Sequence, residues 1–335
     1  MFRRHGRRRT NILFVIFRLI LSLTIFATLL AGLYSASKHF SGVDPLKLDP
    51  KTAGASILGL LSKLNLPKDL QVKISEKIPA TKQAVHQDSP KAAVSGVNEM
   101  IFKFALIADS HSDNIFLKKA LDQIKKDYPD IQFIIGLGDY TEVGTLNELK
   151  NVKAQLDSTG LRYFVAPGDH DLWDSRNKSL TPLANFNQIF GPSYQSFSFG
   201  NFKFIILFNS DNYLGLGESQ KSWLSEQLAR KDSAGIFVFL HEPLFHPSSD
   251  HFMGRVQDNL KNEAADLTRQ LASAGVKRVF AGDTHYFTEY KDPQIGIQMV
   301  TIGAITSARN LQNPRFSIVS VYEDGNSGVE DVEVK

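Results

Sequence analysis

The chain of 335 residues has 42% apolar and 22% charged residues, an ordinary globular composition that excludes disorder over most of its length. It contains no cysteine, which excludes disulfide scaffolds, thiolate zinc sites, iron–sulfur clusters and cysteine nucleophiles. The formal net charge is +3, but the first 18 residues carry six arginines and no acid, and removing these six charges leaves −3. The basic character therefore belongs to the N-terminus, and no nucleic-acid partner is expected for the folded body.

An apolar run follows the N-terminal arginines, from Ile12 to Tyr34, and only Arg18 interrupts it. A membrane-spanning helix needs about 20 residues, and the guanidinium of Arg18 can reach the headgroups. Because the arginines precede the run, we expect residues 1–10 in the cytoplasm, an uncleaved transmembrane signal anchor at 11–34, and the rest of a single-pass cell-membrane protein outside the cytoplasm. A cleaved signal peptide ending near Ser35 and a buried core helix are the alternatives.

Residues 35–99 contain five prolines among many Lys, Ser and Ala residues. Such a segment buries little apolar area, so we expect a linker or stalk. Residues 100–335 then form the folded domain.

Short apolar runs alternate with helix-like segments from residue 101 onward. The predicted strands are Ile101–Ala108, Ile131–Leu137, Leu161–Ala166, Tyr194–Phe199, Phe202–Phe208, Ile236–Leu240, Val276–Phe280, Ile297–Ile302 and Phe316–Val321. The predicted helices are Asn114–Tyr128, Val143–Ser158, Glu218–Lys231 and Val256–Ala274. This alternation predicts an α/β fold, and the dense apolar runs indicate strands that are covered on both faces. Antiparallel pairing near residue 194 and after residue 316 would give a mixed sheet or a two-sheet sandwich.

Acidic and histidine residues directly follow five of the predicted strands. The segments are Asp109-Ser110-His111, Gly138-Asp139, Gly168-Asp169-His170-Asp171, His241-Glu242 and Gly282-Asp283-Thr284-His285. Each Asp alone is explained as a helix N-cap, and each His alone as a surface or core residue. Capping does not explain all five segments, and ligand sites of open α/β sheets lie at these strand ends. Clustered carboxylates repel unless a cation neutralises them, so we predict a metal centre with N and O ligands and favour two ions.

These segments carry a resemblance to a known family. The series D-x-H, GD, GDHD, H and GDTH resembles the metal-binding signature D-x-H, GD, GNH[DE], H and GHxH of the calcineurin-like metallophosphoesterases, over about residues 101–300. Gly138–Gly144 is similar to the GD-x-T-x-x-G element of phosphodiesterase-type members, and Ser219–Leu224 to the S-x-x-x-W-L element of purple-acid-phosphatase-like members. Glu142 stands where purple acid phosphatases have a tyrosine, so no ferric tyrosinate centre is expected.

The resemblance implies a two-sheet αββα sandwich of metallophosphoesterase type and a role for each matched residue. The implied metal ligands are Asp109, His111 and His285 at the first ion, Asp139 as the bridge, and Asp169, His241 and Asp283 at the second ion. His170 would stand beside the leaving group, and Asp171 would hold its ring.

Two positions depart from the family pattern, since Asp169 replaces Asn and Asp283 replaces His. The ligand set then has four carboxylates, which balance two divalent ions completely. At ~4 Å and an effective dielectric constant of ~20, each added charge is worth on the order of 4 kcal/mol. We expect the second site to favour Mn²⁺, Mg²⁺ or iron over Zn²⁺, or to take a trivalent ion, and weak occupancy is the alternative. A protonated Asp169 could also imitate Asn as a hydrogen-bond donor.

Such a site would hydrolyse a phosphomonoester or phosphodiester by a hydroxide that bridges the ions, with His170 as the leaving-group acid. The expected topology places this catalytic domain outside the cytoplasm. The alternative, motivated by the two departures, is a degenerate relative that binds metal or ligand without turnover. The arginine cluster alone favours a third class, a membrane-tethered nucleic-acid protein, although its position is better explained by topology. Nearby loop residues, His246, His251, Arg176 and Lys178, are interpreted as surface residues in preference to substrate contacts, and no oligomeric state is predicted.

Overall fold

The computed structural model describes residues 98–335 except residues 231 and 311. The predicted basic N-terminus (1–10), signal anchor (11–34) and nearly all of the linker (35–99) lie outside the described residues. Within the described part of the chain, none of the helices has the length and apolar character that crossing a membrane requires.

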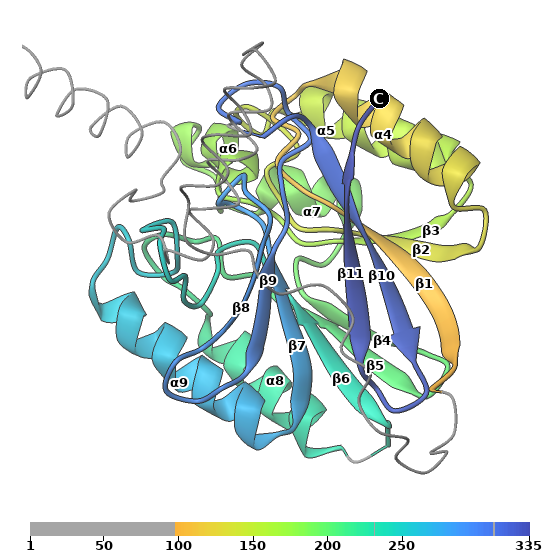
Figure 1. The fold of residues 1–335 in the computed structure, drawn as a ribbon. Helices are drawn as coiled ribbons and strands as arrows, with labels where there is room; N and C mark the ends of the chain where they lie inside the picture. The colour runs from red at the N-terminus through yellow and green to blue at the C-terminus, as the bar shows by residue number, and fades with distance from the viewer. Residues whose placement is uncertain (1–97, 231, 311) are drawn as a thin grey trace, which may run out of the picture.

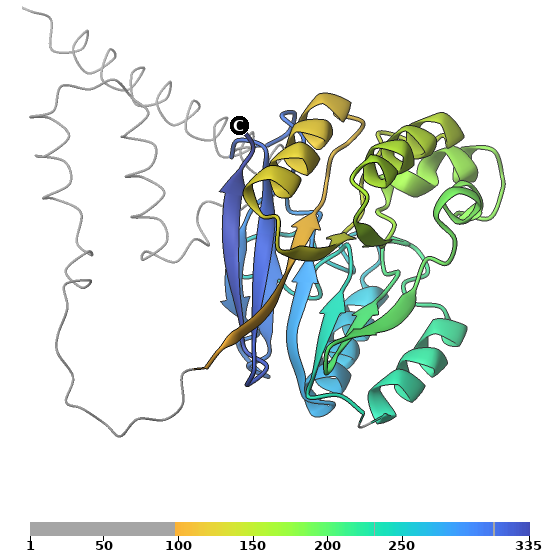
Figure 2. The same ribbon diagram turned by 90° about the vertical axis from the view of Figure 1, so that its right-hand side faces the viewer.

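Two mixed β-sheets lie face to face, and helices cover their outer sides (Figures 1 and 2). The first sheet has the order β11-β10-β1-β2-β3. Its strands are β1 (Met100–Ile107), β2 (Ile131–Gly136), β3 (Arg162–Val165), β10 (Arg315–Tyr322) and β11 (Ser327–Glu333). Strands β1, β2 and β3 run parallel, whereas β10 and β11 add antiparallel neighbours.

The second sheet has the order β4-β5-β6-β7-β9-β8. Its strands are β4 (Gln195–Phe199), β5 (Phe202–Ile206), β6 (Gly235–Phe239), β7 (Val276–Ala281), β8 (Thr288–Lys291) and β9 (Gln298–Thr301). The four central strands are parallel, and β4 and β8 are antiparallel edges.

The helices divide between the two sheets. They are α4 (Asn114–Asp127), α5 (Leu146–Ser158), the 3₁₀ turn η1 (His170–Leu172), α6 (Trp173–Asn177) and α7 (Ala184–Phe190), then α8 (Glu218–Ala229) and α9 (Asn259–Ser273). Buried side chains of α4, α5 and α7 pack on the first sheet, and those of α8 and α9 pack on the second.

Strand β1 shows why its sequence is apolar at nearly every position. Phe102, Phe104 and Leu106 point between the sheets, while Ala105 and Ile107 point toward the helices. Successive side chains of a strand face opposite sides, so a strand covered on both faces must be apolar throughout. Phenylalanine rings from both sheets fill the space between them in edge-to-face and stacked pairs.

The predicted α/β fold and its two sheets are confirmed, and every predicted strand and helix is present with bounds shifted by a few residues. The helix expected from Val143 begins at Leu146 because Thr145 and Glu148 form a capping box. Strands β8 and β11 and the short helices α6 and α7 were not predicted from the sequence. Strand β11 has the sequence Ser-Gly-Val-Glu-Asp-Val-Glu, with only two apolar side chains besides the glycine. A half-exposed edge strand needs few apolar residues, so the apolar pattern that marks the predicted strands is absent here.

Candidate metal centre

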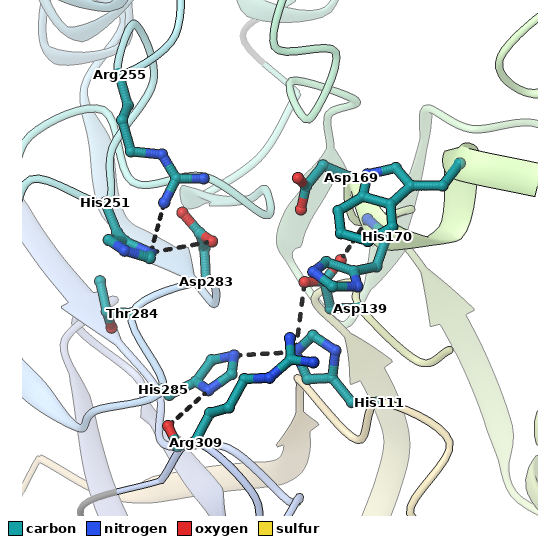
Figure 3. A pocket seen from close by; sticks show the side chains of 11 residues that line it. His111, Asp139, Asp169, His170, His251, Arg255, Asp283, Thr284, His285 and Arg309 are labelled. Atoms are coloured by element: carbon teal, nitrogen blue, oxygen red, sulfur yellow. Dashed lines mark hydrogen bonds and ion pairs between the residues drawn. The ribbon is translucent and has the colours of Figure 1, made fainter. Parts of the chain in front are cut away.

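All seven predicted ligands meet at one end of the two sheets, in the loops after β1, β2, β3, β6 and β7 (Figure 3). Their potential ligand atoms form two groups, each lying within 4.8 Å of one another. The groups are Asp109, His111 and His285, and Asp139, Asp169, His241 and Asp283. The parallel strands bring these loops to the same edge.

The backbone at this edge is unusual. Of the eight described non-glycine residues with positive φ, five are predicted ligands: Asp109, His111, Asp139, Asp283 and His285. A left-handed conformation in a residue with a side chain costs on the order of 1 kcal/mol, and it persists where the surroundings enforce it, commonly at functional sites. The loops thus hold strained turns that aim these side chains inward.

Two glycines permit the close approach of these loops. A Cβ on Gly168 would lie 2.0 Å from Oδ1 of Asp139, and one on Gly138 would lie 2.6 Å from Nδ1 of His241. Gly138 also has a φ of +93°. The glycine before each acid is therefore needed for the site to assemble.

The first group is centred on two imidazoles. Nε2 of His111 lies 3.0 Å from Nε2 of His285 and 3.5 Å from Oδ2 of Asp139, and Nε2 of His285 lies 3.9 Å from Oδ1 of Asp109. Nitrogen and oxygen ligands lie about 2.0–2.2 Å from a first-row ion, so ligands of one ion are about 3–4 Å apart. These separations suit a shared cation.

The second group surrounds His241. Its Nδ1–H donates to the carbonyl of Leu137 at 2.6 Å, so Nε2 is the nitrogen that is left to face a metal ion. Nε2 lies 3.5, 3.8 and 3.9 Å from carboxylate oxygens of Asp139, Asp169 and Asp283. An imidazole that donates one N–H to a carbonyl and presents the other nitrogen to acids is typical of a metal ligand.

Several of these ligand atoms are buried without a hydrogen-bond partner: Oδ2 of Asp109, Nδ1 of His111 and Nε2 of His241. Leaving a buried polar atom unpaired costs about 1–3 kcal/mol, so each such atom needs an explanation. Nε2 of His241 points directly at the carboxylates of the second group. Asp109 and His111 each direct their other side-chain ligand atom toward the remaining predicted ligands. The donor set fits bound cations, because neutral imidazole and carboxylate are both ligands of first-row divalent metals.

Burial also shifts the pKa values of four of the predicted ligands. It raises the pKa of Asp109 to about 8 and that of Asp139 well above its usual range. It lowers the pKa of His285 to about 4 and that of His111 well below its usual value. His111 and His285 are therefore neutral, and the buried carboxylates favour any cation that compensates their charge.

His170 lies beside both groups. Its Nδ1–H donates to the carbonyl of Glu142 at 2.8 Å, its backbone N–H donates to Oδ1 of Asp139 at 3.0 Å, and its ring stacks on Trp173 with centroids 3.8 Å apart. With Nδ1 engaged, Nε2 is the nitrogen available for chemistry. His111, Glu142 and His170 form a third group of potential ligand atoms.

Asp171 differs from its expected role. Its carboxylate accepts from the N–H groups of Gly168 (3.0 Å), Tyr140 (3.4 Å) and Thr141 (3.1 Å) and from the Thr141 hydroxyl (2.7 Å). The expectation that Asp171 holds the ring of His170 is therefore corrected, because the Glu142 carbonyl does so. Fully buried, Asp171 ties the loop after β2 to the loop after β3.

A cavity of about 300 Å³ opens over the two groups, and Figure 3 shows the side chains that face it. Besides predicted ligands and His170, its lining includes Trp173, His251, Arg255, Thr284 and Arg309. Neither arginine was predicted from the sequence, because both lie in long loops, and His251 was expected to be a surface residue. His251 instead lies 3.7 Å from Oδ1 of Asp283.

The other loop residues serve structural contacts. Arg176 forms an ion pair with Asp211 at 3.1 Å, and the buried His246 accepts from two backbone N–H groups. Asn212 donates to Oδ2 of Asp169 at 3.1 Å, which orients that carboxylate from the outside.

Comparison with known proteins agrees with this geometry. Residues 102–287 match the family model described as calcineurin-like phosphoesterase. The human serine/threonine-protein phosphatase CPPED1 is 27% identical over 205 residues, covering 56% of this chain and 63% of that protein. The 3',5'-cyclic-nucleotide phosphodiesterase alr5338 of Nostoc sp. is 24% identical over 217 residues, covering 62% of this chain and 77% of that protein. The matched region thus spans less than two thirds of the human protein's length.

A solved structure shares the fold. The purple acid phosphatase PPD1 of yellow lupin superposes with a TM-score of 0.53 at 15% identity, covering 70% of this chain and 51% of that one.

Proposed function

The family match covers residues 102–287, more than half of the chain, so the chain belongs to the calcineurin-like phosphoesterases, which are enzymes of phosphoester chemistry. We propose that it hydrolyses a phosphoester at a centre of two metal ions. The observation that carries the proposal is the convergence of two groups of buried imidazoles and carboxylates that share one cavity.

The two groups divide the ligands. Asp109, His111 and His285 would hold the first ion, Asp169, His241 and Asp283 the second, and Asp139 both, because its Oδ2 faces His111 and its Oδ1 faces His241. When bound, the ions would lower the pKa of a water molecule to near neutrality, and they would neutralise negative charge on the phosphoryl oxygens.

His170 would deliver a proton to the leaving oxygen. The Glu142 carbonyl fixes the proton on Nδ1, so Nε2 carries the proton that is given up, while Trp173 restrains the ring on one face. A positioned acid of this kind contributes about 10²–10⁴ in rate.

The charge of the second group favours particular ions. Asp169 and Asp283 add two carboxylates beside Asp139, and oxygen ligands suit Mn²⁺, Mg²⁺ or iron more than Zn²⁺. The metals that co-purify with the chain, measured by mass spectrometry, test this preference. Tight filling of both positions by Zn²⁺ would contradict it.

Turnover is tested with the metal-loaded protein and a panel of phosphoesters. We expect metal-dependent hydrolysis that disappears in Asp139→Asn and falls at least about 10²-fold in His170→Ala. Asp130→Asn, at an exposed ion pair far from the cavity, is the matched control and should keep full activity. Metal binding without turnover of any ester would instead establish the degenerate relative that Asp169 and Asp283 raise as the alternative.

The N-terminal anchor is also a proposal, supported by the apolar run of residues 12–34 and the arginines before it. The natural chain has no cysteine, so a single introduced cysteine is a unique topological probe. A cysteine at Ser41 should react with an impermeant thiol reagent on intact cells, and one at Thr10 should not. The reverse pattern would refute the orientation.

A further inference from the structure

The carboxylates of the site offset the charge of the ions they would hold. The side chains of Asp109, Asp139, Asp169 and Asp283 are all buried. Four carboxylates cancel two divalent ions, so ligands and ions together offer no net positive charge to an incoming anion. Any attraction for a phosphoryl anion must come from other residues around the cavity.

Arg309 lines the cavity but already has an acidic partner. Its guanidinium forms an ion pair with the Glu142 carboxylate, and its backbone carbonyl accepts from Nδ1 of His285 at 3.2 Å. The pair contributes no net charge. It places a donor at the side of the cavity where His111 and His285 lie (Figure 3).

Arg255 lines the opposite side, and no carboxylate among the described residues forms an ion pair with it. Its Nη1 lies 2.9 Å from Nδ1 of His251, and because a guanidinium only donates, that nitrogen accepts in this contact. Asp283 faces the same imidazole (Figure 3), but its charge is already counted among the ligands.

Among the residues that line the cavity, Arg255 is therefore the cation that has no direct carboxylate partner, whereas Arg309 is paired with Glu142. An anion that enters the loaded site meets the Arg255 guanidinium as its main source of positive charge beyond the ions themselves.

We infer that this site selects singly charged phosphodiesters over doubly charged phosphomonoesters, an inference that rests on the proposed function. A phosphodiester brings one negative charge, which the Arg255 guanidinium can balance. A phosphomonoester dianion leaves an uncompensated negative charge among buried carboxylates, which is unfavourable in a partly enclosed site. Asp169 and Asp283, the two carboxylates that depart from the family pattern, are thus the residues that determine which substrate charge the site prefers.

The test compares two substrates that share the p-nitrophenolate leaving group but differ in charge. For the Mn²⁺-loaded full chain at pH 8, we expect kcat/KM for bis(p-nitrophenyl) phosphate to exceed that for p-nitrophenyl phosphate at least about tenfold. Calorimetry provides a readout without turnover: the monomethyl ester of phenylphosphonate, a monoanion, should bind at least about tenfold more tightly than the phenylphosphonate dianion.

Charge variants assign the cause. Asp169→Asn removes one negative charge and should shift both ratios about tenfold toward the dianion, with metal content measured alongside. Asp266→Asn makes the same charge change on the exposed face of α9 and should shift neither.

Each outcome is decisive. If the unsubstituted protein prefers the monoester and binds the phosphonate dianion more tightly, the charge inference is wrong, whereas the proposed phosphoester hydrolysis stands. An unchanged ratio in Asp169→Asn also overturns it, because charge would not be the cause. Tighter binding of the monoanion without turnover of either ester supports the charge inference and refutes the proposed hydrolysis.

Discussion

Replacing Asp171 by Asn separates a structural role for this buried carboxylate from a catalytic one. Its two oxygens accept four hydrogen bonds, from Gly168 N, Tyr140 N, Thr141 N and Thr141 Oγ1. An Asn places an NH₂ group against at least one of these backbone donors. The best placement faces Thr141, whose hydroxyl can turn to accept while its N–H loses its partner.

The magnitude follows from those lost bonds. One buried donor without a partner costs about 1–3 kcal/mol, and replacing the charged acceptor by an amide weakens the remaining bonds, so we expect a loss of about 2–4 kcal/mol in unfolding free energy. Metal affinity should fall with it, because Asp171 ties the loop that carries Asp139 to the loop that carries Asp169.

The assay is urea unfolding followed by the fluorescence of the two tryptophans, Trp173 and Trp223, together with metal titration. Thr141→Val, which removes only the hydroxyl bond, is the matched control and should cost about 1 kcal/mol. An Asp171→Asn protein with natural stability and metal affinity but a reduced rate would refute this reasoning and restore Asp171 as the partner of His170.

Further perturbations have equally defined outcomes. Burial lowers the pKa of His246 to about 4, so as pH falls from about 6.5 to 4 the unfolded chain takes up a proton that the folded chain does not, and stability should fall by up to about 3 kcal/mol. His246→Asn keeps an acceptor for Ser248 N and should flatten this part of the stability–pH profile; an identical slope would contradict the assignment. Gly168→Ala places a methyl 2.0 Å from Oδ1 of Asp139 and should abolish metal binding in calorimetry, whereas Gly160→Ala, which meets no atom within 4 Å but has a positive φ, should cost only about 1 kcal/mol in urea unfolding. Chelation with EDTA should lower the melting temperature, and Mn²⁺ at 100 times its Kd should restore about 2.7 kcal/mol of stability; an unchanged melting temperature would argue against bound metal.

The sequence allowed the strand ends to be predicted because their signals are local. Each strand of the centre is a short apolar run that ends in Gly-Asp, Asp-x-His or His-Glu, and parallel strands place such ends together. The strand-end motifs identify all seven residues that are grouped at this edge, and the role of these residues as ligands stays a prediction.

Residues that act through tertiary contact were not predictable in this way. Arg255 and Arg309 reach the cavity from loops whose path no periodicity encodes. The partner of His170 is the backbone carbonyl of Glu142, and a carbonyl leaves no mark in the sequence, so the neighbouring Asp171 was assigned instead. Edge strands β8 and β11 were missed because half-exposed strands need few apolar residues.

Anomalous diffraction from crystals grown with Mn²⁺ measures the central claim most directly. The account predicts two peaks about 3.5–4 Å apart, one among Asp109, His111 and His285, the other among Asp169, His241 and Asp283, with Asp139 between them. No peak in this cavity at saturating Mn²⁺, or peaks bound only by residues outside these two groups, would contradict it.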